Sequence, residues 1–191
     1  MLNNYVKVAG RVMMDPQYNH TSYDEKFYMT YVCVHRLSGI ADIIPVMLSE
    51  NNLVKENDWI LVVGEFRSYN EHMDGCSKLK LYVFCKCLTP CSENTYINEV
   101  VLDAYICKPV TFRITPQGYK ISEVHLGVNR AYGKADYIPC ITWWKTAGYV
   151  RNLPVGTRVE VAGRIQSRDY MKDGVIHQVY EVSAQHMTEV R

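Results

Sequence analysis

The sequence has no run of apolar residues long enough to cross a membrane, which takes about 20. Its first five residues contain neither a basic start nor an apolar stretch, so no secretory signal is expected there. The seven cysteines are an odd number and lack the paired spacings that staple small secreted domains. These absences predict a cytoplasmic protein with reduced thiols, no disulfide and no membrane partner.

Recurring motifs of catalysis are also missing. The chain has no HExxH or GxSxG motif, no phosphate-cradling glycine loop, and no carboxylate cluster typical of a metal-dependent active site. Cys76, Cys85, Cys87 and Cys91 lie close together but form no CxxC pair. Because Cys85 and Cys87 continue the alternating apolar face of a strand, we expect buried free thiols. We therefore expect no enzyme, no metal and no cofactor.

The chain also lacks an excess of either positive or negative charge. The chain carries 21 basic and 20 acidic side chains, with 9 against 10 in residues 1–92 and 12 against 10 in residues 93–191. No basic tail or bulk positive field attracts a polyanion. Any polyanion that binds must therefore be held by a local groove.

What the chain does contain is one pattern that occurs twice. At a constant offset of 94 residues, Arg36, Gly39, Asp42 and Pro45 recur as Arg130, Gly133, Asp136 and Pro139. At an offset of 99, Gly64, Ser68 and Asp74-Gly75 recur as Gly163, Ser167 and Asp173-Gly174. The second copy therefore has five extra residues between the two blocks. The repeat predicts two homologous modules of roughly 90 residues.

Each module reads as five strands separated by turns. The β-rich segments are 5–12, 27–34, 43–48, 59–66 and 78–85, then 100–106, 121–128, 137–142, 158–165 and 175–182. A short helix is expected at 145–152, between the third and fourth strands of the second module. This order is typical of an OB barrel. We predict an all-β protein with two tandem five-stranded OB-fold barrels, each with at most a short helix between strands 3 and 4.

The predicted domain boundaries follow from the repeat. A divergent N-terminal barrel is expected at 1–88 and a C-terminal barrel at 98–191. Residues 89–97 are short and polar with one proline, as a linker would be.

Aromatic and basic residues interleave in the second module. Segment 129–147 contains Tyr132, Tyr137, Trp143 and Trp144 among Arg130, Lys134 and Lys145. Unpaired bases stack on aromatic faces while cations follow the phosphates, so this mixture suits a single-stranded nucleic acid. A second cluster has Arg164, Gln166, Arg168 and Tyr170 on one side of a strand by period two.

The second module closely resembles the bacterial single-stranded DNA-binding protein family. The similar segments are NEVVL (98–102), VNR (128–130), DYIPC (136–140), WKTA (144–147), VAGRIQSR (161–168) and YEV (180–182). They cover nearly all of residues 98–187, whereas residues 3–88 are connected to the family mainly through the internal repeat. The resemblance implies an OB fold that binds single-stranded DNA with little sequence preference. It also implies a nucleoid-associated role in DNA replication, recombination and repair.

The resemblance also implies a set of site residues. By position, the family's base-stacking aromatics fall on Tyr132, Tyr137, Trp143 and Tyr170. Contacts to the DNA backbone are expected from Arg130, Lys145, Arg164 and Arg168. If the strand continues through Trp143 and Trp144, one of the two must face the core. We expect Trp143 to point outward.

The first module departs from this pattern at the same positions. Ser38, Ile43, Ser49 and Glu71 match the four expected stacking aromatics of the second module. We therefore predict weaker DNA binding there, with contacts from Arg11, Arg36, Arg67 and Tyr69.

Partners and alternatives follow from the same resemblance. Family members present four OB barrels per particle, so a chain with two is expected to form a homodimer. Many relatives end in a flexible acidic tail that recruits other replication proteins; the printed sequence shows no such tail, so recruitment is less expected. An alternative is a replication accessory, primosome-type OB protein that acts mainly through protein contacts, which weak salt dependence of DNA binding would favour. A nucleic-acid enzyme is the least favoured interpretation.

Overall fold

The computed structural model describes residues 3–73, 76–172 and 174–190. Its contacts divide the chain into two compact units. The N-terminal unit comprises Tyr5–Arg67 and Leu81–Glu99, and the C-terminal unit comprises Met1–Asn4, Ser68–Lys80 and Val100–Arg191. Segment Ser68–Lys80 thus groups with the C-terminal unit although it lies in the first half of the sequence.

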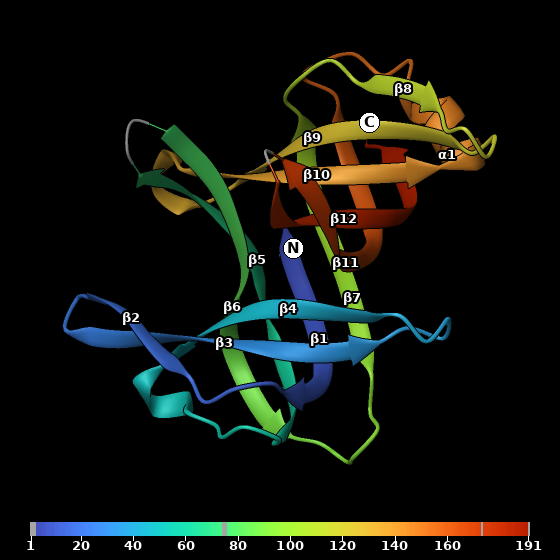
Figure 1. Ribbon diagram of the computed structural model, residues 1–191. Coiled ribbons are helices and arrows are strands. Elements are labelled where there is room, and N and C mark those ends of the chain that lie inside the picture. The colour runs from blue at the N-terminus through green and yellow to red at the C-terminus, as the bar shows by residue number, and fades with distance from the viewer. Residues whose placement is uncertain (1–2, 74–75, 173, 191) are drawn as a thin grey trace. The chain divides into compact units, whose positions relative to one another are not determined.

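The strands of the N-terminal half are β1 (Asn4–Val12), β2 (Gln17–Ser22), β3 (Glu25–His35), β4 (Ala41–Ser49), β5 (Trp59–Met73) and β6 (Cys76–Pro90). Strand β3 pairs antiparallel with β4, β4 pairs parallel with β6, β6 neighbours β5, β5 pairs with β1, and β1 returns to β3. The five strands therefore close into a barrel (Figure 1). Its interior is filled by fully buried apolar side chains, among them Val8, Val32, Ile44 and Val62.

The C-terminal half repeats this topology. Its elements are β7 (Ile97–Ile106), β8 (Thr111–Ile114), β9 (Lys120–Asn129), β10 (Ala135–Trp143), the helix α1 (Trp144–Val150), β11 (Arg158–Lys172) and β12 (Val175–Glu189). Strand β7 pairs with β9, β9 with β10, β10 parallel with β12, β12 with β11, and β11 with β7. Leu102, Leu126, Ile138 and Val182 are buried at its centre. The predicted fold class, two five-stranded OB barrels, is confirmed.

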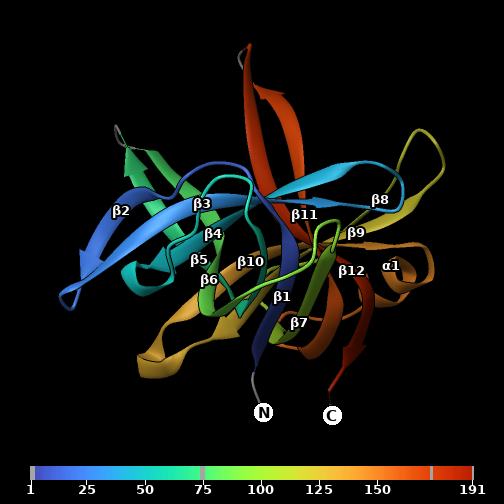
Figure 2. The ribbon, with the colours of Figure 1, turned by 90° about the horizontal axis from the view of Figure 1, so that it is seen from below.

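Two short strands were not predicted from the sequence. Strand β2 pairs with β3, and β8 pairs with β9, so each lengthens a hairpin of its barrel. Both are almost entirely exposed, so they lack the apolar alternation by which a strand is recognised. The predicted strands at 59–66, 78–85, 158–165 and 175–182 were also too short, because β5, β6, β11 and β12 each have 15 residues. Figure 2 shows the β11–β12 hairpin projecting beyond its barrel.

The repeated glycines mark places where the backbone leaves no room or turns sharply. A Cβ at Gly64 would lie 2.0 Å from the carbonyl oxygen of Phe84, and one at Gly163 would lie 2.3 Å from that of Ser183. Gly39 and Gly133 have φ values of +82° and +67°, which favour glycine. Gly64 and Gly163 permit close contact between the fourth and fifth strands of their barrels. Gly39 and Gly133 form the turns between the second and third strands.

The five extra residues of the second copy coincide with the helix. Nine residues separate Ser49 from Trp59, whereas fourteen separate Trp143 from Arg158. The shorter connection contains the three-residue 3-10 helix η1 (Glu50–Asn52), and the longer one contains α1. The helix predicted at 145–152 is therefore confirmed, with its bounds moved toward the N-terminus. Its Ala147 is buried, and Ser122 Oγ donates to the carbonyl oxygen of Ala147 over 2.8 Å.

The expected burial of the cysteines holds only in part. Cys85 is buried, but Cys87 is exposed, so that prediction was wrong for Cys87. Strand β6 runs on to Pro90, past its pairing with β4 at Val83 and Phe84, and the alternation that buries Leu81, Val83 and Cys85 ends at Cys85. The side chain of Cys76 lies outside the described residues. Within the described residues, no group of three or more His, Cys, Asp or Glu side chains is arranged to hold a metal, and no helix there is long and apolar enough to span a membrane.

Candidate nucleic-acid interface

An ion pair anchors the start of β10 in the C-terminal unit. Arg130 Nε lies 2.9 Å from Oδ2 of Asp136, whose side chain is fully buried. The other carboxylate oxygen of Asp136 accepts a hydrogen bond of 2.7 Å from the backbone N–H of Ser68. Ser68 Oγ in turn accepts from the backbone N–H of Tyr137 over 2.8 Å, and Arg130 Nη2 donates to the Ser68 carbonyl oxygen over 3.3 Å. The backbone that carries Tyr137 is therefore held from two sides.

The N-terminal unit has the matching ion pair. Arg36 Nε donates to Oδ2 of Asp42 over 2.7 Å, and Asp42 is fully buried. The hydrogen bond to Asp42 raises the pKa of Arg36 above its usual range. The repeated Arg and Asp of the two modules therefore join the ends of the glycine turn between the second and third barrel strands.

Of the four predicted stacking aromatics, two have described side chains. Tyr137 lies on β10 and is 54% exposed. Trp143 ends β10, is half-buried, and directs its Nε1–H to Ser183 Oγ at 3.3 Å. The side chains of Tyr132 and Tyr170 lie outside the described residues; the backbone of Tyr132 belongs to the 3-10 helix η2 (Ala131–Gly133) and that of Tyr170 to β11.

The condition under which one of the two adjacent tryptophans would face the core is not met. The condition is that the strand continues, but β10 ends at Trp143 and α1 begins at Trp144. Trp144 has φ +53°, which turns the chain sharply at this point. Trp143 stays half-buried, and Trp144 is 54% exposed. The residue with the more exposed ring is thus the one that the sequence analysis left out of the site.

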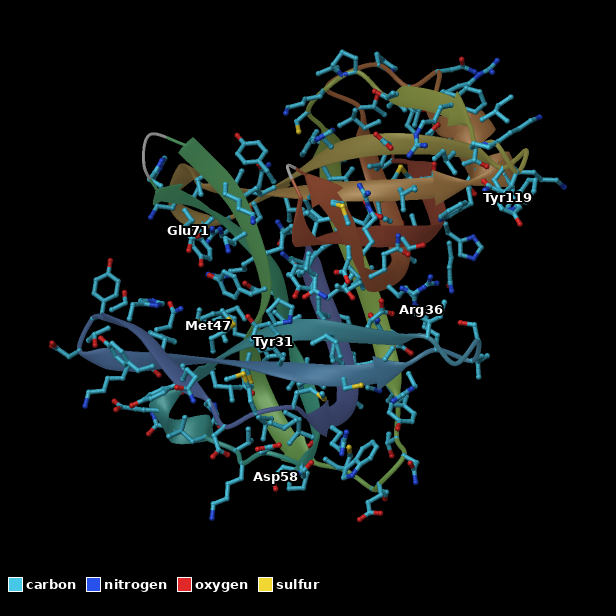
Figure 3. All side chains as sticks on the ribbon, in the orientation of Figure 1. Tyr31, Arg36, Met47, Asp58, Glu71 and Tyr119 are labelled. Atoms are coloured by element: carbon cyan, nitrogen blue, oxygen red, sulfur yellow. The ribbon has the colours of Figure 1, made fainter. Side chains whose placement is uncertain are left out.

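Tyr119 is a second aromatic residue that the sequence analysis missed. Its ring centroid lies 5.1 Å from that of Trp144 at an interplanar angle of 84°, and 6.5 Å from that of Trp143 at 77°. Figure 3 labels Tyr119 at the end of the C-terminal unit where the β8–β9 turn meets α1. The signal that could have found it is Pro116-Gln117-Gly118, a turn sequence between two short β-rich runs.

The predicted backbone-contact residues lie on α1 and on β11. Lys145 is exposed on α1. On β11, Arg164 Nη2 donates to Gln166 Oε1 over 3.3 Å, and Arg168 Nε lies 3.5 Å from Oε1 of Glu181. Gln166 Nε2 donates to the same carboxylate oxygen over 2.7 Å. Arg164, Gln166 and Arg168 therefore share one face of the hairpin, as the period of two predicted, and a buried acid holds this face in place.

The weaker candidates of the first module have partners within the protein. Arg67 is ion-paired with Glu65, and its guanidinium carbon lies 4.6 Å from the centre of the Phe84 ring. Arg11 Nη1 donates to Asn57 Oδ1 over 3.2 Å, and Arg36 is paired with Asp42. Tyr69 is partly exposed but belongs to the segment that groups with the C-terminal unit. Three guanidinium groups in the N-terminal unit are thus engaged by neighbouring side chains.

The closed strand order, found twice in one chain, defines a tandem OB-fold protein. Residues 97–190, about half of the chain, match the Single-strand binding protein family. The matches are to binding proteins and not to enzymes.

Similar sequences come from several bacteria. A single-stranded DNA-binding protein of Bacillus cereus is 37% identical over 97 residues, covering 47% of this chain and 57% of that protein. Single-stranded DNA-binding protein A of Bacillus subtilis is 37% identical over 81 residues, covering 39% of this chain and 47% of that protein. The chain thus spans about half the length of the curated relatives it matches.

A structural comparison covers both halves of the chain. The crystal structure of the wild-type single-stranded DNA binding protein from Thermus aquaticus aligns with a TM-score of 0.80 at 19% identity. The alignment covers 98% of this chain and 93% of that one. The fold of the N-terminal half therefore follows the same architecture, although the family match is confined to residues 97–190.

Proposed function

We propose that this protein binds single-stranded DNA with little sequence preference and protects it during DNA replication, recombination and repair. The observation that carries the proposal is the exposed ring of Tyr137 on a backbone held by Ser68, inside the segment that matches the family. A ring on a fixed backbone offers a stacking surface without a large loss of conformational freedom on binding.

The proposed mechanism combines stacking with phosphate contacts. Unpaired bases stack on Tyr137 and Trp143, and on Tyr132 and Tyr170 by their positions in the family pattern. Each stack contributes about 1–3 kcal/mol and does not depend strongly on the base, because every base has a π-face. Lys145, Arg164 and Arg168 contact the phosphates, and Arg130 supports Tyr137 through its ion pair while remaining partly exposed.

The two units are proposed to bind unequally. In the N-terminal unit, Ser38, Ile43 and Ser49 stand where the C-terminal unit has aromatic rings, and Arg11, Arg36 and Arg67 are engaged internally. The contacts that Arg11, Arg36, Arg67 and Tyr69 make with DNA are therefore weak. We further propose that two chains associate to give four barrels, which light scattering of the purified protein would measure. The domain boundaries 1–88 and 98–191, with a linker at 89–97, also remain part of this proposal.

A fluorescence titration tests the proposal. The protein is titrated with oligo-dT and with a matched duplex at two salt concentrations, and the titration is repeated for Tyr137→Ala and Trp143→Ala. We expect strong quenching by the single strand only, weaker binding at high salt, and a clear loss of affinity in both variants. Equal binding of duplex and single strand, or none of either, would overturn the proposal. Binding with almost no salt dependence would favour the accessory-protein alternative.

A further inference from the structure

We propose that Trp144 and Tyr119 form an additional stacking step for an unpaired base, next to Trp143, with Lys120 and Lys145 as the adjoining phosphate contacts. This inference rests on the proposed function and extends the site along the β8–β9 turn and the start of α1.

The two rings are accessible and already in contact with each other. Trp144 is 54% exposed and Tyr119 is 43% exposed. Their planes meet at 84° with centroids 5.1 Å apart, an edge-to-face contact that leaves more than half of the Trp144 side chain in solvent. Tyr119 also meets Trp143 edge-on, so the three rings form one continuous cluster.

Packing does not account for the left-handed backbone conformation at Trp144. A φ of +53° is costly for a residue with a bulky side chain and would be free of strain for glycine. Because the indole stays 54% exposed, burial compensates little for this strain beyond the edge-to-face contact with Tyr119. The corresponding position of the N-terminal unit, 94 residues earlier, is Glu50, which is exposed at the start of η1. The barrel can therefore be built without an aromatic ring at this position, and an exposed, strained tryptophan is typical of a binding role.

Positive charges adjoin the two rings in the chain. Lys120 follows Tyr119, Lys145 follows Trp144, and both lysines are exposed. The strands bring the two pairs together, because Ile121 of β9 lies opposite Trp143 of β10. Two aromatic rings with a cation beside each are the elements by which sequence-tolerant proteins hold a base and its flanking phosphates.

Substitution of Trp144 by glycine separates this role from a structural one. Trp144→Gly removes the ring and also relieves the backbone, so the variant should unfold at the wild-type temperature or above it. Binding is measured by the anisotropy of a labelled oligo-dT of about 30 nucleotides, long enough for two OB folds. We expect the Kd to rise about tenfold in Trp144→Gly and several-fold in Tyr119→Ala.

Tyr149 provides the matched control. It is exposed on the same helix as Trp144. Because the two residues are five positions apart, their side chains point in directions about 140° apart around the helix axis. Tyr149→Ala should therefore change the Kd less than twofold. If Trp144→Gly binds like the wild type while Tyr137→Ala is impaired, the further inference fails and the proposed function stands. If the wild type itself does not prefer the single strand, the proposed function fails. If Trp144→Gly and Tyr149→Ala lose affinity equally, the effect is not stacking at Trp144, and the inference is overturned.

Discussion

The guanidinium of Arg130 lies against the fully buried carboxylate of Asp136, with 2.9 Å between Nε and Oδ2. The same carboxylate accepts a hydrogen bond from the backbone of Ser68, a residue from the first half of the sequence. Asp136 on β10 therefore ties together Ser68 of β5 and Arg130, which follows β9, next to the residue Tyr137 with its exposed ring. An arginine expected to contact DNA also has a part in building the surface on which DNA would lie.

Loss of the Asp136 carboxylate should strongly destabilise the C-terminal unit. Asp136→Ala leaves Arg130 without its buried partner and the Ser68 N–H without its acceptor, and breaking such a buried pair costs about 3–5 kcal/mol. The measurement is the urea midpoint of unfolding. The control is Asp103→Ala, which breaks a more exposed ion pair with Arg158 and should shift the midpoint much less. Equal shifts in the two variants would contradict the role assigned to Asp136.

Gly163 should not tolerate even a methyl group. A Cβ there would lie 2.3 Å from the Ser183 carbonyl oxygen, so β11 and β12 must move apart in Gly163→Ala. Overpacking of this kind costs about 1–3 kcal/mol. A Cβ at Gly148 in α1 would meet no neighbouring atom within 4 Å, and Gly148→Ala should stabilise the protein by about 0.5–1 kcal/mol through helix propensity. Thermal unfolding of the two variants should move in opposite directions, and a common direction would refute the assignment.

Cys87 should be the first of the described thiols to react with a disulfide reagent. Burial raises the pKa of Cys85 to about 11 and raises that of Cys140 as well, so both stay protonated and unreactive at pH 8. Cys87 is exposed. Labelling is measured in a Cys76→Ser background, because the Cys76 side chain is not among those described.

In that background, Cys87→Ser should remove the fast phase of labelling. Because Cys85 loses its proton only as the pH approaches its raised pKa of about 11, its slow phase should quicken as the pH rises toward that value. A fast phase that survives in Cys87→Ser would show that another thiol is open to solvent.

The salt dependence of DNA binding should report on Lys145. Each phosphate contact to a single strand contributes about 0.7 to the slope of log K against log salt concentration. Lys145→Ala should therefore lower the slope by about that amount, because Lys145 is exposed. Arg67→Ala should change it less, since Arg67 is already paired with Glu65 and lies over Phe84. A slope unchanged in Lys145→Ala would remove that residue from the interface.

The parts of the fold that depend on burial could be predicted from the sequence. The core strands alternate between inward and outward side chains, and the repeated glycines and the Arg–Asp pairs mark turns and close contacts that each barrel needs. Strands β2 and β8 escaped prediction because their residues are exposed, and their pairing with β3 and β9 leaves no apolar pattern.

The site was harder to predict than the fold. Tyr137 was singled out as a candidate because it occupies a family position on a regular strand. Trp144 was missed because the decisive fact is a backbone turn with φ +53°, which no spacing of residue types indicates. The internal partners of Arg36 and Arg67 were missed for a similar reason, since ion pairs depend on which strands meet.

The tight contacts at Gly64 and Gly163 have a consequence for the ancestry of the protein. If the chain arose by duplication, the binding surfaces of the two copies were free to diverge, and Ser38 and Tyr132 now occupy matching positions. A position with no space for a methyl group has no such freedom, because any substitution must force two strands apart. The similarity of the two halves is therefore preserved best where the backbone is most crowded, and it can persist after the surface side chains have diverged.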